Sequence, residues 1–172
     1  MNATEPAGNT ELREHFDWIS RHDARARKNQ YAFHAEIRRL IGLHVMEGER
    51  VLEWGCGAGD LLASTKPGRG VGLDLSPKML EKARERYPGD HLDFRAGDLH
   101  EGSPEEPFDA ILLDYLTGYL ADLQTCFRNL LASSHARTRL YITSLNTLCR
   151  PILAASQPLG LVMKQPPSNW LS

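Results

Sequence analysis

The sequence lacks several features that would point to particular classes of protein. Its 22 acidic and 20 basic residues nearly cancel in a chain of 172, so there is no broad positive charge of the kind that binds nucleic acid. No run of apolar residues approaches the length of a membrane span, and no N-terminal stretch has the apolar core of a signal peptide. Repeats and low-complexity tracts are also absent. We therefore expect one cytoplasmic domain that binds neither nucleic acid nor membrane.

Cysteine is scarce, and its spacing excludes two kinds of site. Cys56, Cys126 and Cys149 include no C-x-x-C pair, so they suit neither a zinc site nor a disulfide framework. We expect a reducing compartment and no bound metal. Cys56 lies inside a glycine-rich turn, where a packing role is expected rather than a nucleophilic one.

The most informative stretch is residues 51–60, in which three glycines stand at alternate positions after an apolar pair and an acid. Glycine has no Cβ, so the backbone can take a positive φ and a ligand can approach it closely. A dinucleotide-binding turn, G-x-G-x-x-G, would need glycine where Asp60 stands. A G-x-x-x-x-G-K-S/T phosphate loop is excluded because no Lys-Ser or Lys-Thr pair follows. The remaining pattern is E-x-G-x-G-x-G at the end of a strand.

Three later segments each look like a short strand that ends in an acid. Asp74 follows the short segment Gly-Val-Gly-Leu at 70–73, where a carboxylate can accept hydrogen bonds from ribose hydroxyls of an adenosyl or NAD cofactor. Asp98 follows an alternating strand, and Asp114-Tyr115 ends an apolar run typical of a buried parallel strand. Taken singly, each acid suits a solvated strand end, a turn or a helix cap equally well. Together they favour a ligand at the carboxyl edge of an α/β sheet.

Strands and helices alternate through residues 47–172, which predicts a mainly parallel sheet with right-handed crossovers. Ser76-Pro77 predicts a helix start, with serine as the N-cap. Residues 1–46 are expected to form an N-terminal helical cap containing two amphipathic helices, Thr10–Ser20 and about Asn29–Val45.

The order and spacing of these segments resemble class I S-adenosylmethionine-dependent methyltransferases. E-x-G-x-G-x-G matches the motif I of that family, and LDLSPKML at residues 73–80 is similar to the segment after its second strand. The resemblance implies a Rossmann-like three-layer sandwich with strand order 3-2-1-4-5, S-adenosyl-L-methionine as cofactor and S-adenosyl-L-homocysteine as product. The residues that it predicts to bind the cofactor are Glu53, Gly55, Cys56, Gly57, Gly59, Asp74, Leu75, Asp98, Leu99, Asp114 and Tyr115.

The resemblance also implies roles for some of these residues. The glycine turn would pass under the methionine part of the cofactor, and Glu53 would help to hold its amino group. Asp74 would accept from the ribose hydroxyls. Asp98 would accept from the adenine amino group, and the N–H of Leu99 would donate to the adenine ring.

The acceptor of the methyl group is expected to be a small molecule. The sequence has no N-P-P-Y or D-P-P-Y signature, which this superfamily links to amino-nitrogen methylation of DNA or glutamine, and no proline-cysteine motif for cytosine methylation. The candidate wall residues are Trp18, Tyr31 and Phe33, each of which suits an ordinary core equally well. No catalytic residue is assigned, although the histidines of the same segment include candidates for a base: His15, His22 and His34.

The C-terminal end departs from the resembled family, which has two further strands after the fifth. Nothing after the strand at 139–143 reads as a strand, so we expect either a truncated chain or an edge covered by a partner, and self-association through an uncovered edge. Two other functions remain open. One is a truncated, catalytically silent domain that binds S-adenosylmethionine or another protein. The other is an NAD-dependent oxidoreductase, which Asp60 disfavours.

Overall fold

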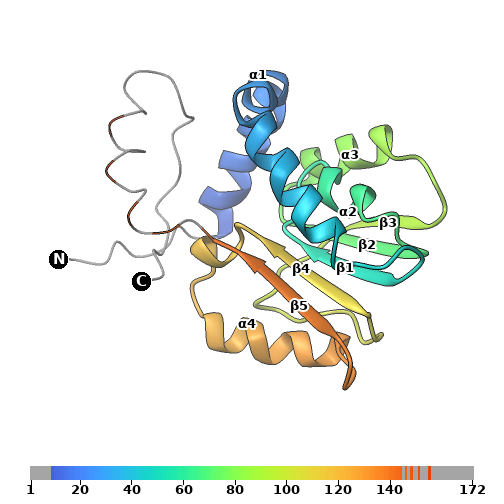
Figure 1. Ribbon diagram of the computed structural model, residues 1–172. Helices are drawn as coiled ribbons and strands as arrows, with labels where there is room; N and C mark the ends of the chain where they lie inside the picture. Colours follow the sequence, from blue (N-terminus) through green and yellow to red (C-terminus); the bar gives the residue numbers. More distant parts are fainter. Residues whose placement is uncertain (1–8, 145, 147, 149–150, 152–154, 156–172) are drawn as a thin grey trace.

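The computed structural model describes residues 9–144 with 146, 148, 151 and 155, except that the side chains of residues 22–33 are not described. Its centre is a five-stranded sheet (Figure 1). The strands are β1 (Arg50–Trp54), β2 (Arg69–Asp74), β3 (Leu92–Ala96), β4 (Ala110–Asp114) and β5 (Arg139–Thr143). Their order is β3-β2-β1-β4-β5, and all four strand pairs are parallel. The predicted fold class and strand order are confirmed.

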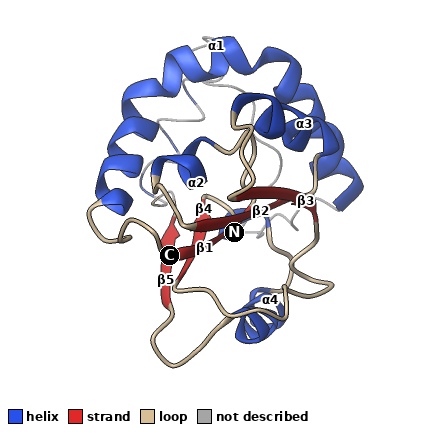
Figure 2. Cartoon of the chain, turned by 90° about the vertical axis from the view of Figure 1, so that its right-hand side faces the viewer, coloured by secondary structure: helices blue, strands red, loops and turns tan. Residues whose placement is uncertain are grey.

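Helices cover both faces of the sheet. The α-helices are α1 (Asn9–Gly42), α2 (Asp60–Ser64), α3 (Pro77–Arg86) and α4 (Leu123–Leu130), with short 3-10 helices η1 (Thr117–Tyr119) and η2 (Leu131–Ser133) on either side of α4. Figure 2 shows α1, α2 and α3 on one face and α4 on the other. Covering on both sides explains why four of the five residues in each of the central strands β1 and β4 are buried.

Two apolar cores lie on the two faces of the sheet. The core beneath α1, α2 and α3 includes Ile37, Ile41, Leu62, Leu80 and Phe94. The core above α4 includes Leu52, Trp54, Leu113, Cys126 and Leu130. Successive strand residues point to opposite faces, so Val51 belongs to the first core and Leu52 to the second. This double burial fixes the register of the strands and hence the edge at which their carboxyl ends meet.

Helix α3 begins as the sequence predicts. The Oγ of Ser76 accepts a hydrogen bond from the backbone N–H of Met79 at 3.2 Å, and Pro77 occupies the first helical position. The basic side chains of Arg84 and Arg86 lie in the last turn, where they complement the helix dipole. The cap therefore fixes the direction in which the chain leaves the end of β2.

The N-terminal region contains one helix where the sequence predicted two. Helix α1 runs without a break through residues 9–42. The segment between the two predicted helices, residues 21–28, contains neither proline nor glycine and is rich in alanine, arginine and lysine, which favour helix. Ile37 and Ile41 of α1 are buried on the sheet side, so its second half is part of the core.

The C-terminal predictions fall outside the described residues. The sequence also predicts a helix at 147–155 and a closing loop at 165–172; these segments and the expected absence of further strands all concern residues that the structure does not describe or describes only singly. Within the described part, β5 pairs only with β4. Two of its apolar side chains, Leu140 and Ile142, are 43% and 44% exposed.

Candidate functional site

The turn after β1 lies at the carboxyl edge of the sheet and contains three glycines with positive φ. These angles are 71° at Gly55, 51° at Gly57 and 80° at Gly59, a region that residues with side chains rarely adopt. A Cβ added at Gly57 would meet nothing within 4 Å, whereas one at Gly59 would lie 2.7 Å from the ring of Phe94. Gly59 thus allows close packing, and Gly57 leaves bare backbone facing open space.

Glu53, at the end of β1, is a buried carboxyl group. It is 2% exposed, and its Oε2 accepts a hydrogen bond from the N–H of Leu62 at 2.9 Å, which ties β1 to α2. Burial raises the pKa of Glu53 well above its ordinary value, and the nearby carboxyl groups of Asp114, Asp74 and Asp60 raise it further. Because these acids repel one another, a cationic group placed among them would be stabilised.

Asp74 lies at the end of β2 and contacts the glycine turn. Its Oδ2 accepts from the N–H of Gly57 at 2.8 Å, and its Oδ1 accepts from the N–H of Ser76 at 2.8 Å. Burial raises the pKa of Asp74, while these backbone donors act in the opposite direction. A carboxylate oxygen has two lone pairs, so each oxygen retains acceptor capacity for a ligand hydroxyl.

Asp98 follows β3, and its two carboxylate oxygens have different hydrogen-bond partners. Its Oδ1 lies 2.9 Å from the backbone N of His100 and 2.9 Å from Nδ1 of the same residue. Its Oδ2 accepts from the side-chain amide of Asn9, at the start of α1. The next residue, Leu99, is 3% exposed and belongs to the core on the α4 side.

Asp114 and Tyr115, at the end of β4, are joined to the end of β5. The N–H of Tyr115 lies within hydrogen-bonding distance of the carbonyl and the Oγ1 of Thr143, at 3.2 and 3.1 Å, and the Thr143 hydroxyl donates to Asp114. Tyr115 has a φ of 54°, a strained conformation for a residue with a large side chain. The ring of His34 from α1 lies edge-on to it at 6.4 Å. Burial raises the pKa of Asp114, which the Thr143 hydrogen bond opposes.

The first turns of α1 lie across this edge of the sheet (Figure 1). The Oγ of Ser76, at the start of α3, donates to the carboxylate of Asp17. On the other flank, the rings of Phe16 and Tyr119 meet edge to face at 5.5 Å. Helix α1 therefore contacts the segments that follow β2, β3 and β4.

The structure describes only one of the three predicted pocket-wall side chains. Trp18 is 44% exposed and stacks on His15, with ring centroids 6.5 Å apart. Burial lowers the pKa values of His15 and His34, which favours neutral imidazoles. Among the described residues, Nε2 of His15 is buried without a hydrogen-bond partner. The side chains of Tyr31, Phe33 and His22 lie outside the described part of the chain.

The structure thus brings the ends of β1, β2, β3 and β4 together with the predicted residues that they carry. The sequence reasoning missed the polar residues that contact the predicted carboxylates or the cap residue Ser76: Asn9, Asp17, His100 and Thr143. Only His100 had a local signal, because a side chain two residues after an aspartate is within its reach. The other three contacts join residues distant in sequence.

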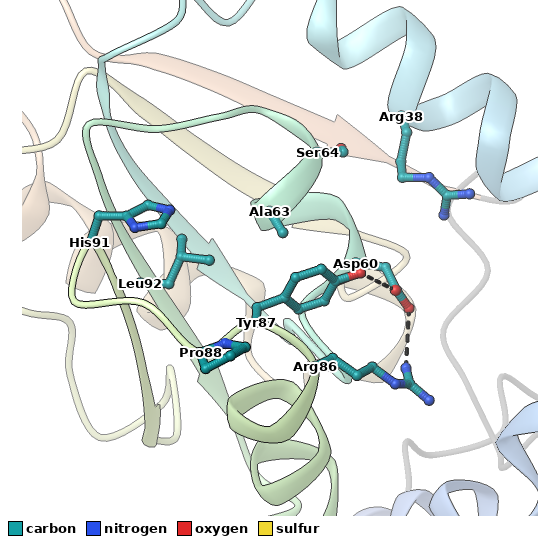
Figure 3. Close-up of a pocket in the computed structure, with 9 residues that line it drawn as sticks. All are labelled: Arg38, Asp60, Ala63, Ser64, Arg86, Tyr87, Pro88, His91 and Leu92. Atoms are coloured by element: carbon teal, nitrogen blue, oxygen red, sulfur yellow. Dashed lines mark hydrogen bonds and ion pairs between the residues drawn. The ribbon is translucent and has the colours of Figure 1, made fainter.

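A separate cavity of about 540 Å³ lies between α1, α2 and the end of α3 (Figure 3). Its lining residues are Arg38, Asp60, Ala63, Ser64, Arg86, Tyr87, Pro88, His91 and Leu92. The Tyr87 hydroxyl donates to Asp60 at 2.6 Å, and Arg86 pairs with the same carboxylate at 3.5 Å. None of the residues predicted to bind a cofactor lines this cavity, but Asp60 belongs both to its lining and to the carboxyl groups that act on Glu53.

The described part of the chain contains no group of three or more His, Cys, Asp or Glu residues placed to hold a metal ion. None of its helices is long and apolar enough to cross a membrane.

Known proteins match the central part of this chain. Residues 51–134 match a family model described as a methyltransferase domain. The chain is 40% identical to trans-aconitate 2-methyltransferase of Streptomyces coelicolor over 86 residues, which are 43% of this chain and 28% of that protein. It is 37% identical to ribosomal protein L11 methyltransferase of Alteromonas mediterranea over 100 residues, 54% of this chain and 33% of that protein. The matches therefore span about a third or less of these relatives.

Solved structures extend the likeness to the fold. A chain from the complex of the Haloferax volcanii Trm112 methyltransferase activator with a putative methyltransferase has a TM-score of 0.65 and 27% identity, and the match covers 74% of this chain and 58% of that one. An S-adenosylmethionine-dependent methyltransferase from Mesorhizobium loti has a TM-score of 0.51 and 29% identity, with 58% and 48% covered. The strand order, the matched residues 51–134 and these solved structures support a class I S-adenosylmethionine-dependent methyltransferase.

Proposed function

We propose that this chain binds S-adenosylmethionine at the carboxyl edge of its sheet and transfers the methyl group to an acceptor. The observation that carries the proposal is the set of carboxyl groups around a glycine turn with open backbone. The charges of Asp60, Asp74 and Asp114 each act on the carboxyl group of Glu53, and Asp74 accepts a hydrogen bond from the N–H of Gly57. Such a site favours a ligand with positive charge.

The same charges distinguish the two nucleoside cofactors that the sequence left open. S-adenosylmethionine carries a sulfonium and an ammonium group, whereas NAD carries two phosphates. In a dinucleotide-binding turn the phosphates lie at the N-terminus of the helix that follows. Here that helix begins with Asp60, and its N-terminal turn accommodates the buried carboxyl of Glu53. Phosphates would be repelled, so the site supports S-adenosylmethionine over NAD.

The contacts suggest how each part of the cofactor would be held. Asp74 would accept from the ribose hydroxyls through the lone pairs that Gly57 and Ser76 leave available. Asp98 would accept from the adenine amino group through Oδ2, where the amide of Asn9 is the donor in this structure. Leu99 would donate its backbone N–H to the ring.

The methionine part of the cofactor would lie over the glycine turn. Gly55, Cys56, Gly57 and Gly59 would supply backbone there, with Glu53 beneath the amino group. Leu75 would pack beside the nucleoside, and Asp114 and Tyr115 would border the methyl group.

Methyl transfer would then depend mainly on alignment and exclusion of water. The sulfonium supplies an activated methyl, so an acceptor lone pair forms the new bond as the carbon–sulfur bond breaks and S-adenosylhomocysteine leaves. The chain would contribute by holding the acceptor in line and by covering the edge with α1. His34 lies beside Tyr115 with its pKa lowered by burial, so it would be available to accept a proton from an acceptor that must lose one.

The acceptor is proposed to be a small molecule, and the catalytic cycle is proposed to occur in the cytoplasm. The two relatives described above are named for trans-aconitate and for a ribosomal protein, so the family includes both classes of acceptor. One structural neighbour comes from a complex with an activator protein, so binding of a protein partner should be tested as well. The cytoplasm is consistent with Cys56 and Cys126, which are free thiols.

A methyl-transfer screen tests the proposal. The purified chain is mixed with S-adenosylmethionine carrying a labelled methyl group and with separate pools of small carboxylic acids, small amines and ribosomal proteins. We expect label to move to a small-molecule pool, and Asp74→Ala to abolish the transfer. A chain that binds the cofactor but labels no pool would support the alternative, a catalytically silent binding domain.

A further inference from the structure

The ring of His100 joins two parts of the molecule through both of its nitrogens. Nδ1 lies 2.9 Å from Oδ1 of Asp98. Nε2 lies 3.2 Å from the backbone N of Ala121 and 3.3 Å from that of Asp122, in the loop between η1 and α4. The imidazole therefore bridges the loop after β3 and the segment that follows the end of β4.

The partners of the ring fix its tautomer. At Ala121 and Asp122 the group that lies against Nε2 of His100 is a backbone N–H, which can only donate. Nε2 must therefore accept and must carry no proton. A neutral imidazole then carries its proton on Nδ1, which donates to the Asp98 carboxylate. Each nitrogen thus has the hydrogen-bonding role that its neighbour requires.

The Asp98 carboxylate is oriented by this donor. Its Oδ1 accepts both the backbone N–H and the Nδ1–H of His100, which leaves Oδ2 as the oxygen directed to the start of α1. The side chain of Asp98 is 9% exposed, so it has little freedom to turn without losing these donors.

A second contact ties the same segment to α4. The side-chain amide of Asn129 donates to the carbonyl of Leu99 at 2.7 Å and lies 3.1 Å from that of His100. The backbone of this segment is therefore held independently of the imidazole. Removing the ring should disturb the orientation of Asp98 more than the path of the chain.

We propose that His100 is a positioning residue of the cofactor site: its Nδ1–H holds the Asp98 carboxylate with Oδ2 directed at the adenine amino group. The proposal rests on the function proposed above and adds a residue to it. It also gives the site selectivity, because a carboxylate fixed in this way attracts a 6-amino purine and repels a 6-oxo purine, whose oxygen is an acceptor. The ligand class is thus restricted to adenine nucleosides.

Three substitutions of His100 distinguish the effect of its contact with Asp98 from the effect of its contact with residues 121 and 122. The amide nitrogen of asparagine reaches the place of Nδ1, so His100→Asn keeps the donor to Asp98 but loses the contact with residues 121 and 122. His100→Gln places an amide oxygen near the position of Nε2 and keeps only that second contact. His100→Ala loses both, and His91→Ala removes an exposed histidine that lines the separate cavity, as a control.

Calorimetric titration with S-adenosylhomocysteine and with its 6-oxo analogue, S-inosylhomocysteine, provides the readout. We expect His100→Ala and His100→Gln to bind S-adenosylhomocysteine about tenfold more weakly, and to lose part of the preference for it over the analogue, as removal of one charge-assisted hydrogen bond predicts. His100→Asn and His91→Ala should retain both. Rescue by glutamine instead of asparagine, or no change in any variant, would overturn the proposal.

A measurement without ligand separates this proposal from the proposed function. Imidazole ¹⁵N shifts of the free protein report which ring nitrogen carries the proton, and we expect His100 to be neutral and protonated on Nδ1. The other tautomer would overturn the positioning role even if the cofactor binds. If the tautomer is as expected but wild-type protein binds neither nucleoside, the proposed function fails, and with it the adenine role of His100.

Discussion

Asp74 accepts two backbone hydrogen bonds and retains lone pairs on both oxygens, so the same carboxylate can hold the turn and a ribose. We predict that Asp74→Ala weakens S-adenosylmethionine binding at least tenfold, because hydrogen bonds to a charged acceptor contribute about 1.5–3 kcal/mol each. Calorimetric titration measures the loss, and circular dichroism checks that the variant is folded. An unchanged dissociation constant in the folded variant would remove Asp74 from the site.

Gly57 offers a test of the turn itself, with a matched control elsewhere in the chain. Gly57 and Gly48 both have positive φ, 51° and 86°, and a Cβ at either would meet nothing within 4 Å. A valine at either position therefore brings similar backbone strain, but only the one at 57 would occupy the space proposed for the ligand. We predict that Gly57→Val abolishes cofactor binding while Gly48→Val retains it. Equal affinities in the two variants would mean that the turn is only structural.

At the scale of elements, Glu53 links the end of β1 to α2 through the N–H of Leu62. Its pKa is raised by burial, so the folded protein holds a proton that the unfolded chain releases once the pH exceeds the ordinary pKa of a glutamate. The contribution of Glu53 to the free energy of unfolding should therefore be fully present below that pH. It should decline as the pH rises toward the raised pKa of the folded state.

Replacing the carboxyl group of Glu53 tests the predicted direction of this pH dependence. Glu53→Gln keeps an oxygen that can accept from Leu62 but does not ionise, so its free energy of unfolding should decline less from pH 5 to pH 8. Asp74 and Asp114 also have raised pKa values, so part of the decline should remain. Urea unfolding at several pH values measures both proteins. A steeper decline in the variant than in the wild type would contradict the assignment of a buried, protonated Glu53.

The elements also show which parts of the fold could be predicted from the sequence. All five strands were predictable, because each has a local signature: an apolar run or an alternating run, with an acid or a turn at its end. The N-cap at Ser76 was predictable for the same reason. Helix α1 was not, because nothing local specifies whether the basic segment at 21–28 continues the helix, and its contact with the sheet depends on residues far along the chain.

The residues of the candidate site also fall into two groups, those that local sequence patterns predict and those that they do not. Gly57, Asp74 and Asp98 were found from motif spacing, which is local. Asn9, which donates to Asp98, and Asp17, which accepts from Ser76, come from α1 and meet the strand ends only after the sheet has formed. Side-chain contacts across long stretches of sequence leave no periodicity or spacing to detect, so the cover that α1 forms over the site required the structure.

At the scale of the whole molecule, β5 is the edge strand of the described sheet and pairs only with β4. Leu140 and Ile142 are each more than 40% exposed on the same face of this strand, at 43% and 44%. An apolar edge strand invites pairing with another chain, and a charge on it opposes that pairing.

We predict that the purified chain self-associates through this edge. Light scattering at several concentrations should show a mass that rises with concentration, and Ile142→Lys should suppress the rise. Glu85→Lys, a change of an exposed side chain on α3, serves as the control and should behave as the wild type. A wild-type chain that stays monomeric at all concentrations would show that the edge is covered.

The central claim is that the carboxyl-edge site holds S-adenosylmethionine, and a calorimetric titration of the purified wild-type chain tests it most directly. S-adenosylmethionine and NAD are titrated separately under the same conditions. The carboxyl groups around the glycine turn predict saturable binding of S-adenosylmethionine and no binding of NAD. Saturable binding of NAD, or no binding of S-adenosylmethionine by the folded protein, would contradict the account.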